Sequence, residues 1–325
     1  MPMTILVTGA TGFLGSHLVQ RLVEEGHRVK ILIRPGSLSS VARHLRVQAI
    51  TGDVTNQRET SEAIHGCDVV IHAAANLSYW GNDRSVLEQV NVEGTRNVVH
   101  ACRLNGVTRL IHVSSVAAIG IPDSPERPAG EEFLFNLEGK NLPYHLSKHK
   151  AEQIVLDEVN RGLDAVIVNP ASIFGPYRTT YRGADMLHKV RKTRIVPYFT
   201  GGICVVHVED VVSGIQAALR HGTTGHRYIL GGENVSFLSL VQRTAAAMDI
   251  QRWFVPVFPF VTGLAASILE PLGRFRGRRP SITYVTHYCA GRYHFYSSEK
   301  AARTFGYAPR PFDSILHECL QMRMC

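Results

Sequence analysis

The stretch TGATGFLG, Thr8–Gly15, stands between an apolar run, Thr4–Thr8, and an amphipathic segment, Leu14–Glu25. Its three glycines are spaced by three residues, unlike the G-x-G-x-x-G of the standard dinucleotide fingerprint. Glycines let the backbone turn tightly and approach a pyrophosphate, whose charge then faces a helix N-terminus. We therefore predict a strand, a phosphate-binding loop and a helix; the alternative is that the glycines serve turn geometry alone.

The first half of the chain alternates short apolar runs with amphipathic segments. We predict strands at Thr4–Thr8, Arg28–Ile33, Val47–Thr51, Asp68–His72, Arg109–Val113 and Ala165–Val168, and helices at Leu14–Glu25, Val86–Leu104 and Ser147–Asn160. Buried apolar runs that alternate with helices indicate a parallel sheet covered on both faces. The expected fold class is therefore α/β, with a Rossmann-like doubly wound parallel sheet.

The pattern loosens after Pro170, where Gly, Pro and aromatic residues dominate. We expect a smaller, interleaved substrate-binding lobe there, and two short strands, Cys204–His207 and Arg227–Leu230, that return to the main sheet. The predicted division assigns residues 1–170 and 201–232 to the dinucleotide-binding domain. Residues 171–200 and 233–325 form the predicted lobe.

Composition narrows the class of protein. The 325 residues are 45% hydrophobic and 19% charged, which excludes a disordered chain and a coiled coil. The six cysteines are scattered without metal-ligand spacing, and the N-terminus leads directly into a strand, so we expect a cytoplasmic protein without a bound metal.

The formal net charge of +8 is unevenly distributed. Residues 171–200 hold six Lys or Arg against one acidic residue, and residues 274–325 hold nine against three. No stripe of stacking aromatics interleaves with this basic excess, so we expect no nucleic-acid partner. The excess instead favours an anionic substrate or an anionic membrane surface beside the lobe.

Trp253–Gly273 is an apolar stretch with a single charge, Glu270, followed by the basic run RFRGRR, Arg274–Arg279. A basic-flanked segment of this length is compatible with a helix pair in the lobe, peripheral membrane contact or a membrane span. Three prolines and Glu270 interrupt it, which argues against a span. We expect the helix pair.

Cofactor choice depends on the end of the second strand, about 20 positions past the last glycine, where an acidic residue would bind the ribose 2′-hydroxyl of NAD. That position holds Arg34, followed by Ser37, Ser39 and Ser40. A guanidinium can bind a 2′-phosphate bidentately, which favours NADP(H). The alternative is a solvated Arg34 with NAD bound. Asp53, just past the third strand, is expected to accept from the adenine amino group.

Two further segments predict acid–base chemistry. Tyr144 and Lys148 are four residues apart, on one face of a predicted helix, where the lysine charge is expected to lower the pKa of the phenol. A phenol of this kind can pass a proton to or from a substrate oxygen while hydride moves. Ser114 and Ser115 lie at the carboxyl end of the fifth strand, where site residues project.

Several motifs occur together and in a recognisable order: TGATGFLG, GDV, HAAA (His72–Ala75), NVEGT (Asn91–Thr95), SSVAAIG (Ser114–Gly120), YHLSK, NPASIFGP (Asn169–Pro176), VHVEDVV (Val206–Val212) and YILGGE (Tyr228–Glu233). Over essentially its whole length the chain resembles an extended short-chain dehydrogenase/reductase of the NAD-dependent epimerase/dehydratase superfamily. Within it, the chain is most similar to bacterial dihydroflavonol-4-reductase-like proteins, including hopanoid-associated sugar epimerases.

The resemblance implies a Ser-Tyr-Lys triad of Ser115, Tyr144 and Lys148, with Asn91 ordering the active-site backbone. It also implies a homodimer formed through the helices Val86–Leu104 and Ser147–Asn160. The cofactor-binding residues that we assign are Gly9, Thr11, Gly12, Phe13, Leu14, Gly15, Arg34, Asp53, Val54, Ala73, Ala74, Ala75, Ser114, Tyr144, Lys148, Pro170, Ser172 and Ile173.

We therefore predict an NADP(H)-dependent oxidoreductase that reduces a ketone or aldehyde, or oxidises the alcohol. The expected substrate-binding residues are Asn76, Tyr79, Trp80, Ser115, Tyr144, Phe174 and Tyr177, whose aromatic character suits a flat or apolar ligand. Arg34 departs from the Asp typical of NAD-bound epimerases. The alternatives are a nucleotide-sugar epimerase or dehydratase with tightly bound NAD, and a non-catalytic dinucleotide sensor.

Overall fold

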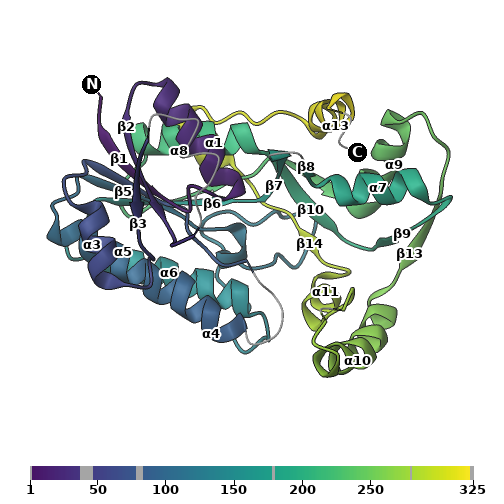
Figure 1. The fold of residues 1–325 in the computed structure, drawn as a ribbon. Helices are drawn as coiled ribbons and strands as arrows, with labels where there is room; N and C mark the ends of the chain where they lie inside the picture. Colours follow the sequence, from purple (N-terminus) through teal and green to yellow (C-terminus); the bar gives the residue numbers. More distant parts are fainter. Residues whose placement is uncertain (1, 37–46, 78–82, 178–179, 279, 323–325) are drawn as a thin grey trace.

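The main sheet of the protein has seven parallel strands. A computed structural model describes residues 2–36, 47–77, 83–177, 180–278 and 280–322 (Figure 1). The strands run in the order β3 (Gln48–Thr51), β2 (Arg28–Ile33), β1 (Thr4–Thr8), β4 (Val69–His72), β5 (Arg109–Val113), β6 (Ala165–Pro170) and β11 (Arg227–Leu230). The order reverses between β1 and β4, which makes their carboxyl ends the expected ligand crevice. This confirms the predicted fold class.

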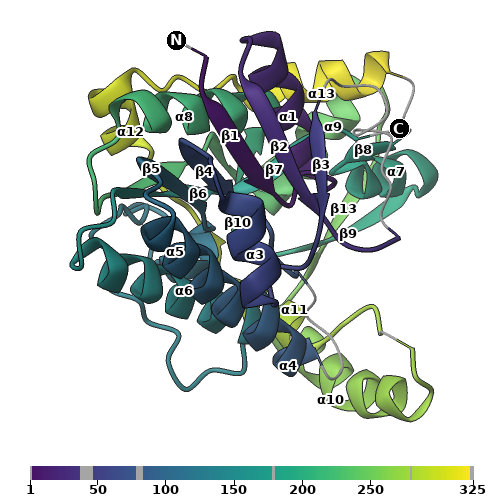
Figure 2. The ribbon, with the colours of Figure 1, turned by 60° about the vertical axis from the view of Figure 1, so that its left-hand side comes forward.

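Helices cover both faces of this sheet (Figures 1 and 2). One face carries α3 (Gln57–Ile64), α5 (Gly94–Leu104) and α6 (Pro143–Val159); the other carries α1 (Phe13–Glu24), α8 (Val208–His221) and α12 (Glu299–Phe305). Every residue of β1, β4 and β6 is buried, because side chains on both strand faces pack against helices. The result is one apolar core on each side of the sheet.

The segment predicted as one helix over Val86–Leu104 is helical but not uniform. It consists of α4 (Asp83–Leu87), a π-helical stretch η1 (Glu88–Glu93) and α5. The wide π turns are uncommon and occur frequently at functional sites. Here they contain Asn91.

The lobe is built on a second sheet with the order β12 (Glu233–Ser236), β10 (Gly202–His207), β7 (Ser172–Tyr177) and β8 (Thr180–Arg182), with β14 (Tyr293–His294) also paired to β10. The prediction that Arg227–Leu230 returns to the main sheet is correct. The same prediction for Cys204–His207 is wrong. β11 occupies the edge beside β6, and β10 pairs instead with β7, the strand into which β6 continues.

Three helices pack on the second sheet and enclose the core of the lobe: α7 (Ala184–Lys192), α9 (Phe237–Ala247) and α13 (Phe312–Gln321). A separate parallel pair, β9 (Ile195–Phe199) and β13 (Trp253–Val257), packs against α9. The lobe thus has its own apolar core.

Trp253–Gly273 is not the predicted helix pair. It begins with strand β13 and continues into a single helix, α10 (Pro259–Phe275), whose helical partner is the separate α11 (Tyr284–Cys289). Pairing with β9 favours the extended form at Trp253–Val257. Within the described ranges, no helix combines the length and apolarity needed to cross a bilayer.

Candidate active site

The loop after β1 brings three glycines against neighbouring backbone. Gly9 has φ of +71°, and a Cβ there would lie 2.6 Å from the carbonyl of Ala73. A Cβ on Gly15 would lie 2.1 Å from the carbonyl oxygen of Gly9, and one on Gly12 would lie 3.2 Å from the same atom. Strand β1, the end of β4 and helix α1 can therefore meet this closely only through glycines.

This close approach places the N-terminus of α1 at the carboxyl ends of β1 and β4, a geometry that suits an anion. Gly12 is the N-cap of α1 in an extended conformation, so Phe13 and Leu14 form its first turn. The first N–H groups of a helix lack partners within the helix and carry partial positive charge. We call the loop formed by Gly9, Gly12 and Gly15 with the first turn of α1 the pyrophosphate cradle. Its close backbone packing and its free helix N–H groups fit the pyrophosphate of a dinucleotide.

Of the residues predicted to bind the adenosine end of the cofactor, the structure describes Arg34, Asp53 and Val54. Arg34 is exposed directly after β2, and among the described residues no carboxylate pairs with it. Ser37, Ser39 and Ser40 lie outside the described residues. Asp53 Oδ1 accepts from both the amide and the hydroxyl of Thr55, each at 2.9 Å, and its own amide donates to Glu59 Oε2 at 2.8 Å. Val54 is buried against Gly94.

The segment from His72 to Ala75, at the end of β4, is held by hydrogen bonds to β1 and α5. His72 is buried between the hydroxyls of Thr8 (2.7 Å) and Thr95 (3.1 Å), and burial, with a smaller contribution from Lys148, lowers its pKa to about 3. The neutral His72 imidazole therefore connects the end of β1, at Thr8, to helix α5, at Thr95. The Thr8 hydroxyl also accepts from the amide of Ala74 at 3.2 Å, while Ala73 and Ala75 are partly or fully accessible.

Asn91 connects this segment to helix α6. Its Oδ1 accepts from the amide of Asn76 at 2.7 Å, and its Nδ2 donates to the carbonyl of Asn76 at 3.0 Å and to Ser147 Oγ at 2.9 Å. Asn91 is 1% exposed, in the π-helical stretch. It fixes the backbone at Asn76 rather than presenting a group to a ligand.

The carboxyl end of β5 meets the start of α6 at a Ser–Tyr pair. Ser115 is the N-cap of a short 3-10 helix, η2 (Val116–Ala118), and its hydroxyl accepts from the amide of Ala117 at 3.2 Å. The Tyr144 hydroxyl hydrogen-bonds to the Ser115 side chain. Ser114 is buried, and its hydroxyl has no partner among the described residues, so it is free to meet a ligand.

Lys148 lies one turn after Tyr144 and is 2% exposed. Its Nζ donates to the carbonyl of Val113 at 3.0 Å. Burial lowers its pKa to about 8, against an opposing effect of Glu152. Since an ammonium has three donors, donors remain for a further acceptor such as a ribose hydroxyl.

The prediction that Lys148 lowers the pKa of Tyr144 does not hold in this structure. Burial raises the pKa of the phenol to about 12, and the hydrogen bond with Ser115 offsets this only in part. Tyr144 is 5% exposed, so removal of water from the phenolate outweighs the effect of its neighbours. The phenol is therefore protonated at neutral pH.

Sequence reasoning missed a set of buried polar residues that pack behind Ser115, Tyr144 and Lys148. Asn169, fully buried in β6, donates to the Ser115 carbonyl at 2.9 Å and to Glu152 Oε1 at 2.5 Å. Glu152 is fully buried and pairs with Arg227 at 3.4 Å. The network links the segment after β5 to α6 and β11. Only the NPASIFGP motif pointed to Asn169, and the apolar strand around it gave no indication of its partners.

The chain crosses from β6 to β7 on the far side of the site. Pro170 ends β6, and Ser172 and Ile173, both half-buried, open β7. Beyond them, Phe174 packs in the core of the lobe, with its ring 6.4 Å from that of Phe312. Tyr177 instead covers the glycine loop.

The Tyr177 hydroxyl donates to the carbonyl of Thr11 at 3.1 Å, and its ring meets that of Phe13 edge-on at 5.5 Å. The structure thus places Tyr177 beside the pyrophosphate cradle, and Phe174 within lobe packing. Of the other predicted substrate residues, Asn76 is held through its backbone by the side chain of Asn91. Tyr79 and Trp80 fall outside the described residues.

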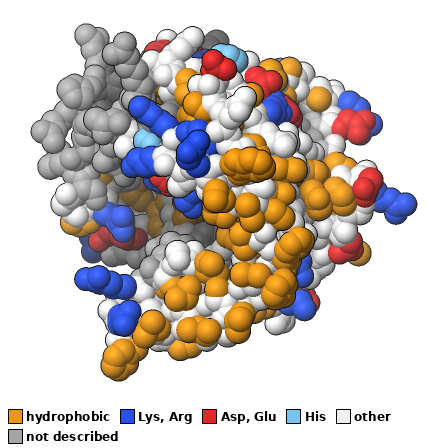
Figure 3. All heavy atoms as spheres, turned by 90° about the vertical axis from the view of Figure 1, so that its right-hand side faces the viewer, with side chains coloured by type: hydrophobic (Ala, Val, Ile, Leu, Met, Phe, Trp, Pro, Cys, Tyr) orange, Lys and Arg blue, Asp and Glu red, His pale blue; other side chains and the backbone are white. Residues whose placement is uncertain are grey.

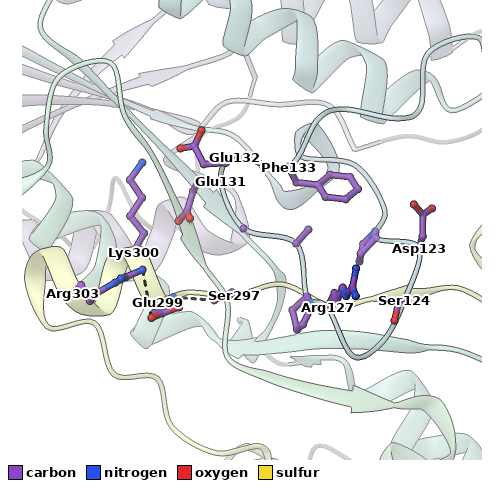
Figure 4. A pocket seen from close by; sticks show the side chains of 14 residues that line it. Asp123, Ser124, Arg127, Glu131, Glu132, Phe133, Ser297, Glu299, Lys300 and Arg303 are labelled. Carbon is purple, nitrogen blue, oxygen red and sulfur yellow. Dashed lines mark hydrogen bonds and ion pairs between the residues drawn. The ribbon is translucent and has the colours of Figure 1, made fainter.

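A separate cavity of about 600 Å³ lies between the loop after η2 and the start of α12 (Figure 4). Its lining includes acidic and basic side chains, among them Glu131, Glu132, Arg127, Lys300 and Arg303. Glu299 pairs with Arg303 at 3.4 Å within it. None of the predicted site residues lines this cavity, so it is distinct from the candidate active site.

Comparison with known proteins adds to this geometry. A model of the NAD dependent epimerase/dehydratase family matches residues 5–231. A Synechocystis protein named "Putative dihydroflavonol 4-reductase" is 33% identical, covering 92% of this chain and 88% of that protein. "Sterol demethylase protein B" of Methylococcus capsulatus is 33% identical, covering 87% and 86%. The crystal structure of gox2253 superposes with a TM-score of 0.83 at 33% identity, covering 98% and 97%.

Proposed function

The chain belongs to the NAD dependent epimerase/dehydratase family of extended short-chain dehydrogenases/reductases, and within it we propose that the protein reduces a ketone or aldehyde with NADPH, or oxidises the corresponding alcohol. Like the family, it is an NAD(P)-dependent oxidoreductase. The observation that carries the proposal is geometric: the Tyr144 hydroxyl hydrogen-bonds to Ser115, and Lys148 lies one turn further along α6 with its Nζ on the carbonyl of Val113.

In the proposed reaction, Ser115 and Tyr144 bind the substrate oxygen, and Lys148 stabilises the phenolate that forms on Tyr144. The Ser115 hydroxyl and the Tyr144 hydroxyl hold the carbonyl oxygen, and Tyr144 donates the proton that the oxygen needs as it becomes an alcohol. Burial raises the pKa of the phenol to about 12, so Tyr144 carries its proton before the transfer, as a proton donor must. Lys148, with a pKa lowered to about 8, supplies positive charge beside a developing phenolate.

When bound, the nicotinamide cofactor supplies or accepts the hydride. The residues proposed to hold its pyrophosphate are Gly9, Thr11, Gly12, Phe13, Leu14 and Gly15. Asp53 and Val54 would border the adenine, Ala73, Ala74 and Ala75 the riboses, and Ser114, Pro170, Ser172 and Ile173 the nicotinamide. The unpartnered, buried Ser114 hydroxyl supports the last of these assignments.

Preference for NADP(H) over NAD(H) rests on Arg34. Its exposed guanidinium follows the β2 strand end and has no carboxylate partner in the described part of the chain. A 2′-phosphate would provide the missing anion, with bidentate geometry available. An acidic residue at this position would instead have repelled that phosphate.

For the substrate we propose an apolar or flat carbonyl compound bound between the sheet edge and the lobe. The relative named for a sterol demethylase protein supports an apolar substrate class. Asn76, Tyr79, Trp80, Phe174 and Tyr177 are the proposed contacts besides Ser115 and Tyr144. We also propose a homodimer, paired through the outer surfaces of α5 and α6, on which Leu104 is exposed.

The proposal is tested by measuring NADPH and NADH oxidation by the purified protein against a panel of ketones, aldehydes and nucleotide sugars. We expect turnover of an apolar carbonyl compound with a clear preference for NADPH. Protein that retains NAD through purification and converts a nucleotide sugar without net NADPH oxidation would overturn the proposal in favour of an epimerase or dehydratase.

A further inference from the structure

Helix α10 presents its large apolar side chains outward. Exposed fractions reach 74% at Phe260, 64% at Leu264, 59% at Ile268 and 89% at Phe275, and Val261 and Leu272 are also exposed. These positions recur at helical spacing and form one stripe. A surface helix normally turns such a stripe toward the core.

The opposite side of α10 is small and polar where it packs on α11. Thr262 and Ala266 are buried there, and the Thr262 hydroxyl lies 3.2 Å from His287 Nδ1. A Cβ on Gly263 would lie 3.0 Å from the same imidazole ring. The orientation of the helix is therefore fixed by close contacts with small residues, and the outward stripe is not a consequence of loose packing.

The stripe continues onto the neighbouring strands. Trp253 and Val255 of β13, Phe258 at the N-cap of α10, and Ile195 of β9 are all exposed. Figure 3 shows apolar side chains gathered over this side of the molecule. Together with the α10 stripe they form what we call the apolar face. It holds ten of the fifteen exposed large apolar residues in the described part of the chain. A concentration of this kind marks an interaction surface.

Positive charge borders the apolar face. Arg276 and Arg278 follow α10, and Lys192 and Arg194 precede β9; all four are exposed, without a carboxylate partner among the described residues. Glu270, the one acidic residue of α10, is turned inward, where it accepts from the amide of Tyr284 at 2.9 Å and pairs with Arg274. Four exposed cations without a carboxylate partner in the described part of the chain therefore lie beside the apolar face.

We propose that the apolar face is a docking surface for an anionic lipid bilayer, with α10 lying in the plane of the headgroups. Phe, Leu and Ile side chains enter the acyl boundary, and the arginines meet lipid phosphates, as in interfacial amphipathic helices. Charge complementarity selects the bilayer over a second copy of this chain. Two copies joined by this face would bring their basic borders together, whereas anionic headgroups attract them.

The docking surface is connected to the candidate active site through α11. Val285 and Tyr288 of α11 pack against Ile121 and Leu142, and Leu142 is the N-cap residue of α6, two positions before Tyr144. A docked protein would thus hold its substrate lobe against the membrane. Docking itself does not depend on which reaction the protein catalyses.

The test is flotation of the full chain with phosphatidylglycerol/phosphatidylcholine vesicles and with phosphatidylcholine vesicles alone. We expect binding to the anionic vesicles that weakens with added salt. The double variant Leu264→Ser/Ile268→Ser should bind at least about tenfold more weakly, because two apolar side chains no longer enter the lipid. Arg276→Glu/Arg278→Glu should lose binding to anionic vesicles selectively.

Leu134→Ser is the matched control, since Leu134 is 85% exposed in the segment between η2 and α6 and belongs neither to the apolar face nor to the proposed dimer interface. It should bind vesicles like the parent. Thermal unfolding and NADPH titration of every variant confirm intact folding and an intact dinucleotide site, so failure to dock is distinguishable from failure of the proposed reaction. Absence of flotation, or flotation unaffected by Leu264→Ser/Ile268→Ser, overturns the proposal. A fall in molar mass caused by that variant would assign the face to a second copy instead.

Discussion

Substitution of Gly15 by Ala tests whether the phosphate loop and α1 are as closely packed as the structure indicates. A Cβ at position 15 would lie 2.1 Å from the carbonyl oxygen of Gly9 and 2.8 Å from its carbonyl carbon. Both obstacles are backbone atoms, so no side-chain rotation relieves the overlap. Restoring an ordinary contact requires α1 to move from the loop by about 1 Å.

The expected stability change is the balance of two opposing effects. Ala at a helix position is favoured over Gly by about 1 kcal/mol. Overpacking costs about 1–3 kcal/mol, and here the upper part of that range applies, because Leu18, Val19 and Leu22 of α1 are fully buried and resist displacement. The net loss should be about 2 kcal/mol, or about 3 °C in Tm for a protein of this size.

The assays are thermal unfolding without cofactor and fluorescence titration with NADPH. Affinity should fall by at least about tenfold, since the N–H groups of α1 move away from the pyrophosphate. Gly130→Ala is the control, because nothing lies within 4 Å of its Cβ and its φ is not in the left-handed region. Gly15→Ala protein as stable as the parent, with unchanged NADPH affinity, would refute the close-packed cradle.

Three further outcomes are expected. Arg34→Asp should lower the affinity for NADPH relative to NADH at least about tenfold in paired titrations; an unchanged ratio removes Arg34 from cofactor selection. Asn169→Ala should destabilise by about 2–3 kcal/mol in urea unfolding, because it leaves the buried Glu152 Oε1 without its donor and removes one of the two donors to the Ser115 carbonyl, which keeps the Ala118 amide. Asn97→Ala, which removes one half-buried hydrogen bond, should cost about 1 kcal/mol; equal losses would contradict the network. The pKa of Lys148 is about 8 when folded, against 10.5 for an exposed lysine, so the unfolded chain holds the extra proton between these limits and stability should rise with pH from about 8 to 10. Lys148→Met should flatten that rise, and an identical slope in both proteins would argue against a buried amine.

The strands of the main sheet were predictable because both strand faces are buried, which leaves continuous apolar runs such as Thr4–Thr8 and Ala165–Val168 in the sequence. The glycine loop was predictable for a related reason, since Gly9 and Gly15 occupy positions that no other residue fits. These features are local. Each follows from a few consecutive residues and their backbone requirements.

Features that depend on distant partners were not predictable. Strand β10 joins the second sheet because β11, far along the chain, occupies the edge beside β6. Asn169 and Glu152 carry no local pattern, and their role appears only when β6 and α6 are packed together. The pKa of Tyr144 was predicted in the wrong direction because the spacing to Lys148 is visible in the sequence, whereas burial of the phenol is not.

The most direct test of the central claim is single-turnover reduction by Tyr144→Phe protein loaded with NADPH, using the best carbonyl substrate from the panel. Loss of the phenolic proton donor should slow the hydride-transfer step by about 10²–10⁴-fold, with NADPH affinity unchanged because the glycine loop and Arg34 are intact. A rate equal to that of the parent protein, with the same NADPH affinity, would contradict the assignment of Tyr144 as the proton donor.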